Sequence, residues 1–119
     1  MVHRLSDDDP TAASHRLTPA ALHVLLALAD QDRHGLGIAD HIEAFTHGSM
    51  SLGPGSLYGT IKRLLGQHLI ADVPARPDGS PDPRRRYYRL TASGRRALEA
   101  HTRDLATVLG IARLKRVIR

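Results

Sequence analysis

The stretch that decides the fold is residues 53–69, GPGSLYGTIKRLLGQHL. Proline is tolerated at the first position of a helix, so the glycine-proline-glycine opening predicts a helix that begins at Pro54 or just after it. At 100° per residue the apolar side chains fall within about a third of the circumference. The residues of this arc are Leu57, Ile61, Leu64, Leu65 and His68. The opposite face is small or cationic and comprises Gly55, Gly59, Lys62, Arg63 and Gly66.

Repeated glycine is the unusual feature of this second face. A glycine inside a helix costs roughly 1 kcal/mol relative to alanine, so its repetition on an exposed face indicates a surface that must come close to another molecule. The two cations on the same face favour a partner that carries phosphate groups.

The composition limits the fold and the class of protein. A chain of 119 residues has room for one domain with a modest core, and its four aromatic residues leave that core mainly to Leu, Ile, Val and Ala. The absence of cysteine excludes disulfides and thiolate metal sites. No N-terminal apolar run resembles a signal peptide or a membrane span, so we expect a cytoplasmic protein with no membrane association.

Positive charge is concentrated in the last third of the chain. Residues 16–83 carry five basic and seven acidic side chains, whereas residues 84–119 carry eleven basic and two acidic ones. A basic surface is typical of nucleic-acid binding, although a solvated basic helix that binds nothing would give the same composition. Charge alone leaves both interpretations open.

An arm and two helices are expected before the central helix. Residues 1–15 show no apolar period and predict a flexible arm. A threonine-proline cap predicts a first helix at residues 19–29, and a second is expected at residues 36–46 after a polar turn at residues 30–34. Phe45 falls on the expected buried side of the second helix.

The pattern changes to strands after the central helix. Residues 70–73 are a short strand candidate that is apolar except for Asp72, residues 74–83 are rich in proline and glycine, and residues 84–90 alternate with a period of two. Tyr88 and Leu90 share the face that we assign to the core. The sequence therefore predicts a β-hairpin with a long tip and a basic second strand.

A long final helix is predicted from a Thr91 cap to about residue 117, because no proline interrupts it. At 1.5 Å per residue it would be roughly 40 Å long, too long for so small a domain to cover. One apolar stripe with 4-3-4-3 spacing is Leu98, Thr102, Leu105, Leu109 and Ala112. A second stripe is Val108, Ile111, Leu114 and Ile118.

These two stripes predict two different packing partners. We expect the first to pack on the chain's own first helix and the second to bind a second copy of the chain, which gives a homodimer. The residues that we assign to dimerisation are Leu105, Val108, Leu109, Ile111, Ala112 and Leu114.

Three helices, a two-stranded hairpin and a long last helix are the element order of a winged helix-turn-helix, a mainly α fold with a small β-hairpin. Specific runs extend this likeness: residues 34–38 (HGLGI), residues 52–64 (LGPGSLYGTIKRL) and residues 86–91 (RYYRLT). Over about residues 17–100 the chain resembles the PadR-like family of bacterial transcriptional regulators, in particular its small members with a single C-terminal helix.

The resemblance implies a dimeric DNA-binding repressor, with residues 54–67 as recognition helix and residues 72–90 as wing. It divides the chain into an arm at 1–15, a winged helix-turn-helix domain at 16–91 and a dimerisation helix at 92–119. A two-fold dimer would bind an inverted-repeat operator. The chain has no tryptophan of the kind on which some family members stack planar drugs, so a flat aromatic inducer is not implied and a small-molecule effector is left open.

We assign double-stranded DNA to the small cationic helix face and to the wing. Tyr58 could donate to a phosphate or contact a base, or it could be a half-buried packing residue. The run at residues 84–86 lies where phosphate or minor-groove contact is natural, although arginine runs in loops are often merely solvated. For Arg95 and Arg96, phosphate contact and solubility of the helix are both open. The full assigned set is Ser56, Tyr58, Gly59, Thr60, Lys62, Arg63, Arg84, Arg85, Arg86 and Arg89.

Other functions find less support in the sequence. His34, His41 and His47 bracket the second helix but form no i, i+4 pair on one face, so we predict no metal site and no cofactor. No Ser-His-Asp set or carboxylate pair stands at an interpretable spacing, so we expect no enzyme. The alternative to a DNA-binding regulator is a winged-helix protein-interaction module that does not read DNA sequence.

Overall fold

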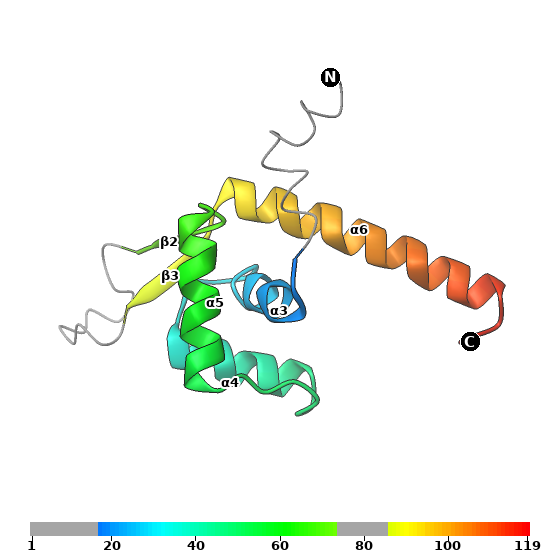
Figure 1. Ribbon diagram of the computed structural model, residues 1–119, viewed down its shortest axis with the longest axis horizontal. Coiled ribbons are helices and arrows are strands. Elements are labelled where there is room, and N and C mark those ends of the chain that lie inside the picture. Colours follow the sequence, from blue (N-terminus) through cyan, green and yellow to red (C-terminus); the bar gives the residue numbers. More distant parts are fainter. Residues whose placement is uncertain (1–16, 74–85) are drawn as a thin grey trace, which may run out of the picture.

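The computed structural model describes residues 17–73 and 86–119, and within them four helices and three short strands follow one another (Figure 1). In chain order they are α3 (Pro19–Ala27), β1 (Arg33–His34), α4 (Gly35–Phe45), α5 (Pro54–Gly66), β2 (Ile70–Asp72), β3 (Tyr87–Leu90) and α6 (Ala92–Leu114). The mainly helical fold with a small sheet and a long C-terminal helix is confirmed. The expected arm at residues 1–15 and the expected hairpin tip at residues 74–83 lie outside the described residues.

Local capping chemistry sets where the helices begin. The Thr18 hydroxyl accepts a 3.1 Å hydrogen bond from the backbone amide of Ala21, and Pro19 follows as the first helical residue of α3. The Thr91 hydroxyl accepts likewise from the amide of Gly94 at 3.0 Å and starts α6. α5 begins at Pro54, as the sequence predicts.

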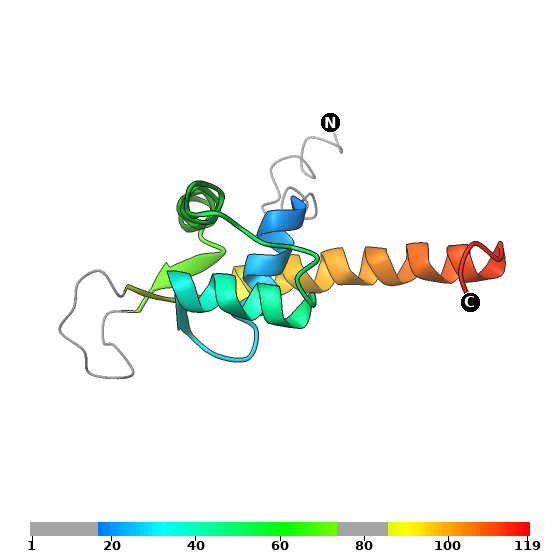
Figure 2. The same cartoon turned by 90° about the horizontal axis from the view of Figure 1, so that it is seen from below.

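The core lies between α3, α4, α5 and the sheet, and the first turns of α6 close it (Figure 2). Its largest fully buried side chains are Leu25, Ile38, Ile42, Leu57, Leu64, Ile70 and Val24. For two residues the expected burial is wrong. Phe45 is 38% exposed and stacks on His23 at the surface, with ring centroids 5.9 Å apart. His68 is exposed because the helix has already ended at Gly66 and the backbone turns to a φ of 61°, so the helical period no longer applies.

A third strand joins the predicted pair. The antiparallel sheet has the order β1-β3-β2, with Arg33 opposite Tyr88 and Ile70 opposite Leu90. β1 falls at the end of the segment expected to be a polar turn. A strand of two residues is too short to show alternation, so only its pairing with β3 reveals it.

The distal half of α6 is not covered by any other element of residues 17–73 and 86–119 (Figure 1). Leu98 is buried, but every residue from Arg103 to the C-terminus except Ala112 is exposed. The expectation that the whole first stripe packs on the chain's own first helix is therefore wrong, since Leu105 and Leu109 are 46% and 40% exposed. The reason is length: α3 has 9 residues and α6 has 23, which is about 14 Å against about 35 Å.

Candidate nucleic-acid interface

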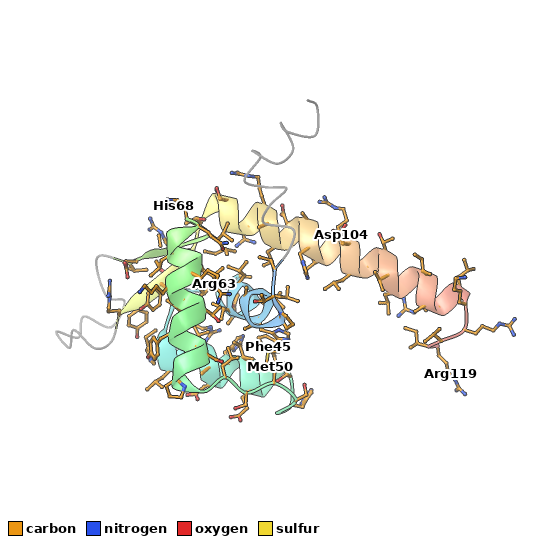
Figure 3. All side chains as sticks on the ribbon, viewed as in Figure 1. Phe45, Met50, Arg63, His68, Asp104 and Arg119 are labelled. Atoms are coloured by element: carbon orange, nitrogen blue, oxygen red, sulfur yellow. The ribbon has the colours of Figure 1, made fainter. Side chains whose placement is uncertain are left out.

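The outer face of α5 is the candidate interface. Seen end-on in Figure 2, α5 lies at the edge of the domain, with its buried side on the core. The exposed residues on its outer side are Gly55, Ser56, Tyr58, Gly59, Lys62, Arg63 and Gly66. Arg63 stands in the last turn, and His68 follows where the chain leaves the helix (Figure 3).

The glycines of this face are not required by packing within the chain. Beyond the adjacent residues and the neighbouring helix backbone, a Cβ added to Gly55, Gly59 or Gly66 would meet no described atom within 4 Å, and none of the three has a positive φ. Each of these glycines lowers the stability of the helix by about 1 kcal/mol relative to alanine. Because they carry no side chains, the outer face is flat, and a partner could approach it closely.

The N-terminal end of α5 presents uncapped backbone amides. The N-cap is Gly53, which makes no side-chain cap hydrogen bond, and Pro54 occupies the first turn. Amides at a helix N-terminus attract anions because of their orientation and of the helix dipole. Ser56 is exposed in the same turn and could share an anion with them.

Thr60 does not lie on this face. The sequence placed it on the exposed flank with Ser56, but Thr60 is only 5% exposed. It lies three residues after Leu57 and four before Leu64, and the domain covers both of these leucines. Its assignment to direct DNA contact is therefore corrected.

Tyr58 stands at the boundary of the face and is 45% exposed. Its phenol lies against the first residue of α4: a Cβ built on Gly35 would be 2.5 Å from the hydroxyl oxygen of Tyr58 and 2.8 Å from Cζ. α5 and the start of α4 thus meet at this ring.

The wing contributes basic side chains from β3 and from the residue before it. Arg89 is exposed on β3, and Arg86 pairs with Asp72 of β2 at 3.1 Å on the surface. An exposed ion pair contributes only about 0–1 kcal/mol, so a phosphate could compete for the Arg86 guanidinium. Arg84 and Arg85 lie outside the described residues.

Tyr88 belongs to the core, as the sequence predicts, and is 5% exposed. Burial raises the pKa of its hydroxyl, Arg86 opposes this shift, and the charges of Asp72 and Tyr58 add to it. Tyr88 therefore stays neutral near physiological pH and holds β3 on the core.

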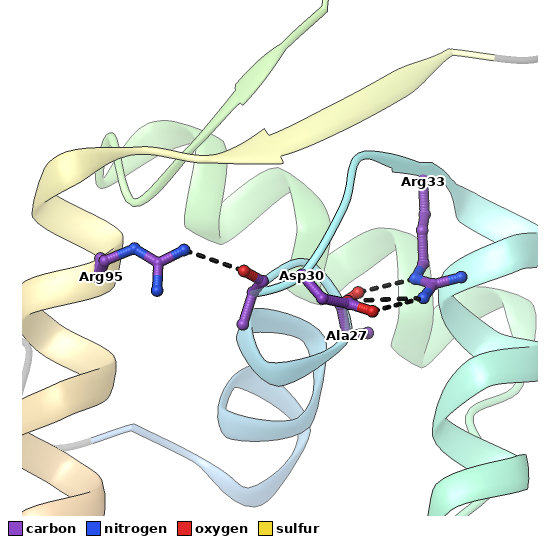
Figure 4. A network of polar contacts seen from close by, with 5 residues as sticks. Ala27, Asp30, Arg33 and Arg95 are labelled. Atoms are coloured by element: carbon purple, nitrogen blue, oxygen red, sulfur yellow. Dashed lines mark hydrogen bonds and ion pairs between the residues drawn. The ribbon is translucent and has the colours of Figure 1, made fainter. Parts of the chain in front are cut away.

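Arg95, for which the sequence left phosphate contact and solubility open, makes a contact within the fold, and so does Arg33, which the sequence analysis did not single out (Figure 4). The guanidinium of Arg95 donates to the carbonyl oxygen of Ala29 at 2.9 Å, and that of Arg33 donates to the carbonyl oxygen of Ala27 at 2.8 Å. Both cations sit at the C-terminal end of α3, where carbonyl groups lack helical partners. No sequence pattern distinguishes such a contact from a solvated arginine.

The histidines of α3 and α4 pack and cap within the described residues. His34 Nδ1 accepts a 3.1 Å hydrogen bond from the amide of Gly37, and the His34 ring contacts Tyr87 edge-on at 5.3 Å. His41 contacts Phe45 in the same way at 5.3 Å. In residues 17–73 and 86–119, no three histidine or acidic side chains come together in a metal-binding group.

None of the helices in the described parts of the chain is both long and apolar enough to span a membrane.

Comparisons with known proteins agree with this architecture. The chain is 24% identical to an RosR complex structure, with a TM-score of 0.65 and coverage of 92% of this chain and 90% of that one. RosR of H. salinarum itself is 25% identical, with a TM-score of 0.59 and coverage of 86% and 87%. A PadR family transcription regulator from Clostridium difficile R20291 is 23% identical, with a TM-score of 0.68 and coverage of 82% and 97%.

A relative is also found among curated proteins, an uncharacterized 37.1 kDa protein in transposon TN4556 of Streptomyces fradiae. It is 38% identical over 95 residues, which are 80% of this chain and 25% of that protein. The chain therefore spans about a quarter of the length of this relative.

The transcriptional regulator PadR-like family matches residues 24–100, which include α4, α5, the strands and the start of α6. With the winged helix built around α5, this match shows that the chain belongs to the PadR-like family of transcriptional regulators.

Proposed function

We propose that this PadR-like regulator is a sequence-specific DNA-binding repressor that acts as a homodimer on an inverted-repeat operator. The observation that carries the proposal is the outer face of α5, where small residues and two cations are exposed while the opposite side of the helix anchors it in the core.

The dimensions of this face suit the major groove. The groove is about 12 Å wide and admits one α-helix, and glycines on the outer face let the helix backbone come close to the bases. Lys62 and Arg63 can contact phosphates or guanine edges, and Tyr58 can contact either from the boundary of the face. Base contacts would specify the sequence, whereas phosphate contacts would orient the protein.

The wing would add affinity without reading the sequence. Arg86 and Arg89 are exposed on or next to β3, and the run at residues 84–86 continues the positive charge toward the tip. Arginines at such a position bind phosphates or a narrow minor groove.

Dimerisation follows from the uncovered half of α6. Its exposed large apolar residues are Leu105, Val108, Leu109, Ile111 and Leu114, and the exposed Val117 and Ile118 follow after the helix has ended. Monomeric proteins rarely leave a contiguous apolar patch of this kind in water, so we infer that a second copy covers it. A two-fold axis through this contact would place two copies of α5 about one DNA turn apart, roughly 34 Å.

An electrophoretic mobility shift tests the proposal. The probe is the DNA directly upstream of the protein's own coding sequence, with a scrambled duplex of equal composition as control. We expect a retarded band with the natural probe at a protein concentration that leaves the scrambled one free. Equal binding to both, repeated with duplexes selected from a random library, would instead favour the protein-interaction module.

A further inference from the structure

We infer that Gly35 is a positioning residue for DNA binding: the absence of a side chain there lets the phenol of Tyr58 lie across the first turn of α4, which holds its hydroxyl at the edge of the DNA-facing surface. This inference rests on the proposed function. It concerns a residue of α4 that does not belong to the outer face of α5.

The backbone at position 35 does not by itself require glycine. Gly35 is the first residue of α4 and has no positive φ. Its surroundings leave no room for a side chain while the Tyr58 ring keeps its position, because an added Cβ would be 2.5 Å from the Tyr58 hydroxyl oxygen and 2.8 Å from Cε1 and Cζ. Real Cβ contacts are essentially never that short, so any larger residue must displace the ring.

A second glycine in the same turn provides the contrast. A Cβ on Gly37 would meet its nearest neighbour, His34 Cε1, at 3.5 Å, which is an ordinary contact. Both glycines lie before the first buried isoleucine of α4, Ile38. Only at position 35 does the missing side chain make room for a residue of the recognition helix.

The Tyr58 ring lies against Gly35 on one side and is exposed to solvent on the other. Gly35 is buried beneath it, whereas Tyr58 itself is 45% exposed. A tyrosine that packs against the backbone on one side has less side-chain freedom to lose when it binds than one that rotates in solvent. The contact with Gly35 therefore prepares the hydroxyl for a phosphate or base, beside Lys62 one turn further along the same helix.

The test is a double-mutant cycle in DNA binding. Duplexes are first selected from a random library with the parent protein, and the affinities of Gly35→Ala, Tyr58→Ala and the double variant are then measured by fluorescence anisotropy. We expect each single variant to bind roughly 5- to 100-fold more weakly, the range expected when one good interaction with a base is removed. In the Tyr58→Ala background, Gly35→Ala should cause no further loss of DNA affinity, because the ring that the added methyl group would displace is absent.

Gly37→Ala is the matched control and should bind like the parent. Urea unfolding of each variant separates an unfolded protein from a folded one that binds DNA weakly. If Gly35→Ala does not fold, the double variant should fold again, and Tyr58→Phe then tests the hydroxyl with the ring in place. Weaker binding by Tyr58→Phe supports the inference.

Three results would overturn the inference. The first is a folded Gly35→Ala variant that binds DNA as tightly as the parent. The second is a decrease in affinity from Gly35→Ala that is the same with and without the Tyr58 side chain. The third applies if Gly35→Ala cannot be studied, and it is a Tyr58→Phe variant that binds as tightly as the parent. Failure of the parent to enrich any sequence would be a different result, since it would remove the proposed function and this inference together.

Discussion

The guanidinium of Arg95 donates a 2.9 Å hydrogen bond to the carbonyl oxygen of Ala29, just beyond the end of α3. This bond ties the first turns of α6 to the helix-turn-helix, while Arg33 of β1 donates to Ala27 from the sheet. Two cations at one helix C-terminus satisfy free carbonyl groups and complement the helix dipole. The end of α3 therefore connects the sheet with the C-terminal helix.

Arg95→Ala should lower the free energy of unfolding by at most about 1 kcal/mol, because it removes a charged hydrogen bond at an exposed site. Urea unfolding measures this. The matched control is Arg96→Ala, whose guanidinium donates to Ser93 of the same helix at 3.1 Å. Its effect should stay within about 0.5 kcal/mol. Equal effects of the two variants would show that the bond to Ala29 does not stabilise the domain.

Tyr88 makes the free energy of unfolding depend on pH in the alkaline range. Because burial raises the pKa of its hydroxyl above the ordinary value of 10.0, the unfolded chain releases this proton first as the pH rises. The contribution of Tyr88 is complete below about pH 10 and is lost above it. We expect the free energy of unfolding to fall more steeply between about pH 9.5 and 11 for the parent than for Tyr88→Phe, with a slope from this one group of at most about 1.4 kcal/mol per pH unit. If the free energies of unfolding of the parent and of Tyr88→Phe change with pH in parallel, the prediction is wrong.

The features that the sequence could predict are the local ones. The apolar period of residues 57, 61 and 64, each capping threonine and the proline at the start of α5 are signals that span only a few neighbouring residues, so each predicts its own helix without knowledge of the rest of the fold. The apolar alternation around Tyr88 predicts its burial in the same way.

The features that escaped prediction depend on distant parts of the chain. β1 exists because Arg33 pairs with Tyr88, and Thr60 is buried because neighbouring elements cover one flank of α5. The contact of Gly35 with Tyr58 joins two runs that the sequence shows separately. The assignment of individual side chains to DNA stays a prediction.

Gly59→Ala should have opposite effects on stability and on DNA binding. The added methyl group would meet no atom within 4 Å beyond the adjacent residues and the neighbouring helix backbone, so the free energy of unfolding should rise by about 0.5–1 kcal/mol through helix propensity. Operator affinity should fall, because the methyl group stands between the helix backbone and the bases. Urea unfolding and anisotropy on the same preparation measure both. Unchanged affinity would show that DNA does not approach the helix at this position.

The wing arginines should act on all DNA sequences alike. Replacing Arg84, Arg85 and Arg86 with alanine should weaken specific and non-specific binding in parallel, and the log-log salt dependence should become shallower by about 0.9 for each phosphate that the wing no longer neutralises. Replacing Arg103, Arg113 and Arg119 removes the same charge from the far half of the molecule as a control. An unchanged salt slope in the wing variant would assign these arginines to bulk solvent.

The uncovered half of α6 gives the prediction on assembly. Leu109 and Ile111 are 40% and 49% exposed on a part of the helix that no other described element covers. If a second copy buries them, Leu109→Asp with Ile111→Asp should yield monomers and abolish operator binding, although neither residue is near α5. Ala106→Asp with Gly110→Asp adds the same two charges outside both apolar stripes and should leave the dimer intact. Sedimentation at micromolar concentration decides: a parent protein that is a monomer there would remove the dimer and, with it, the inverted-repeat operator.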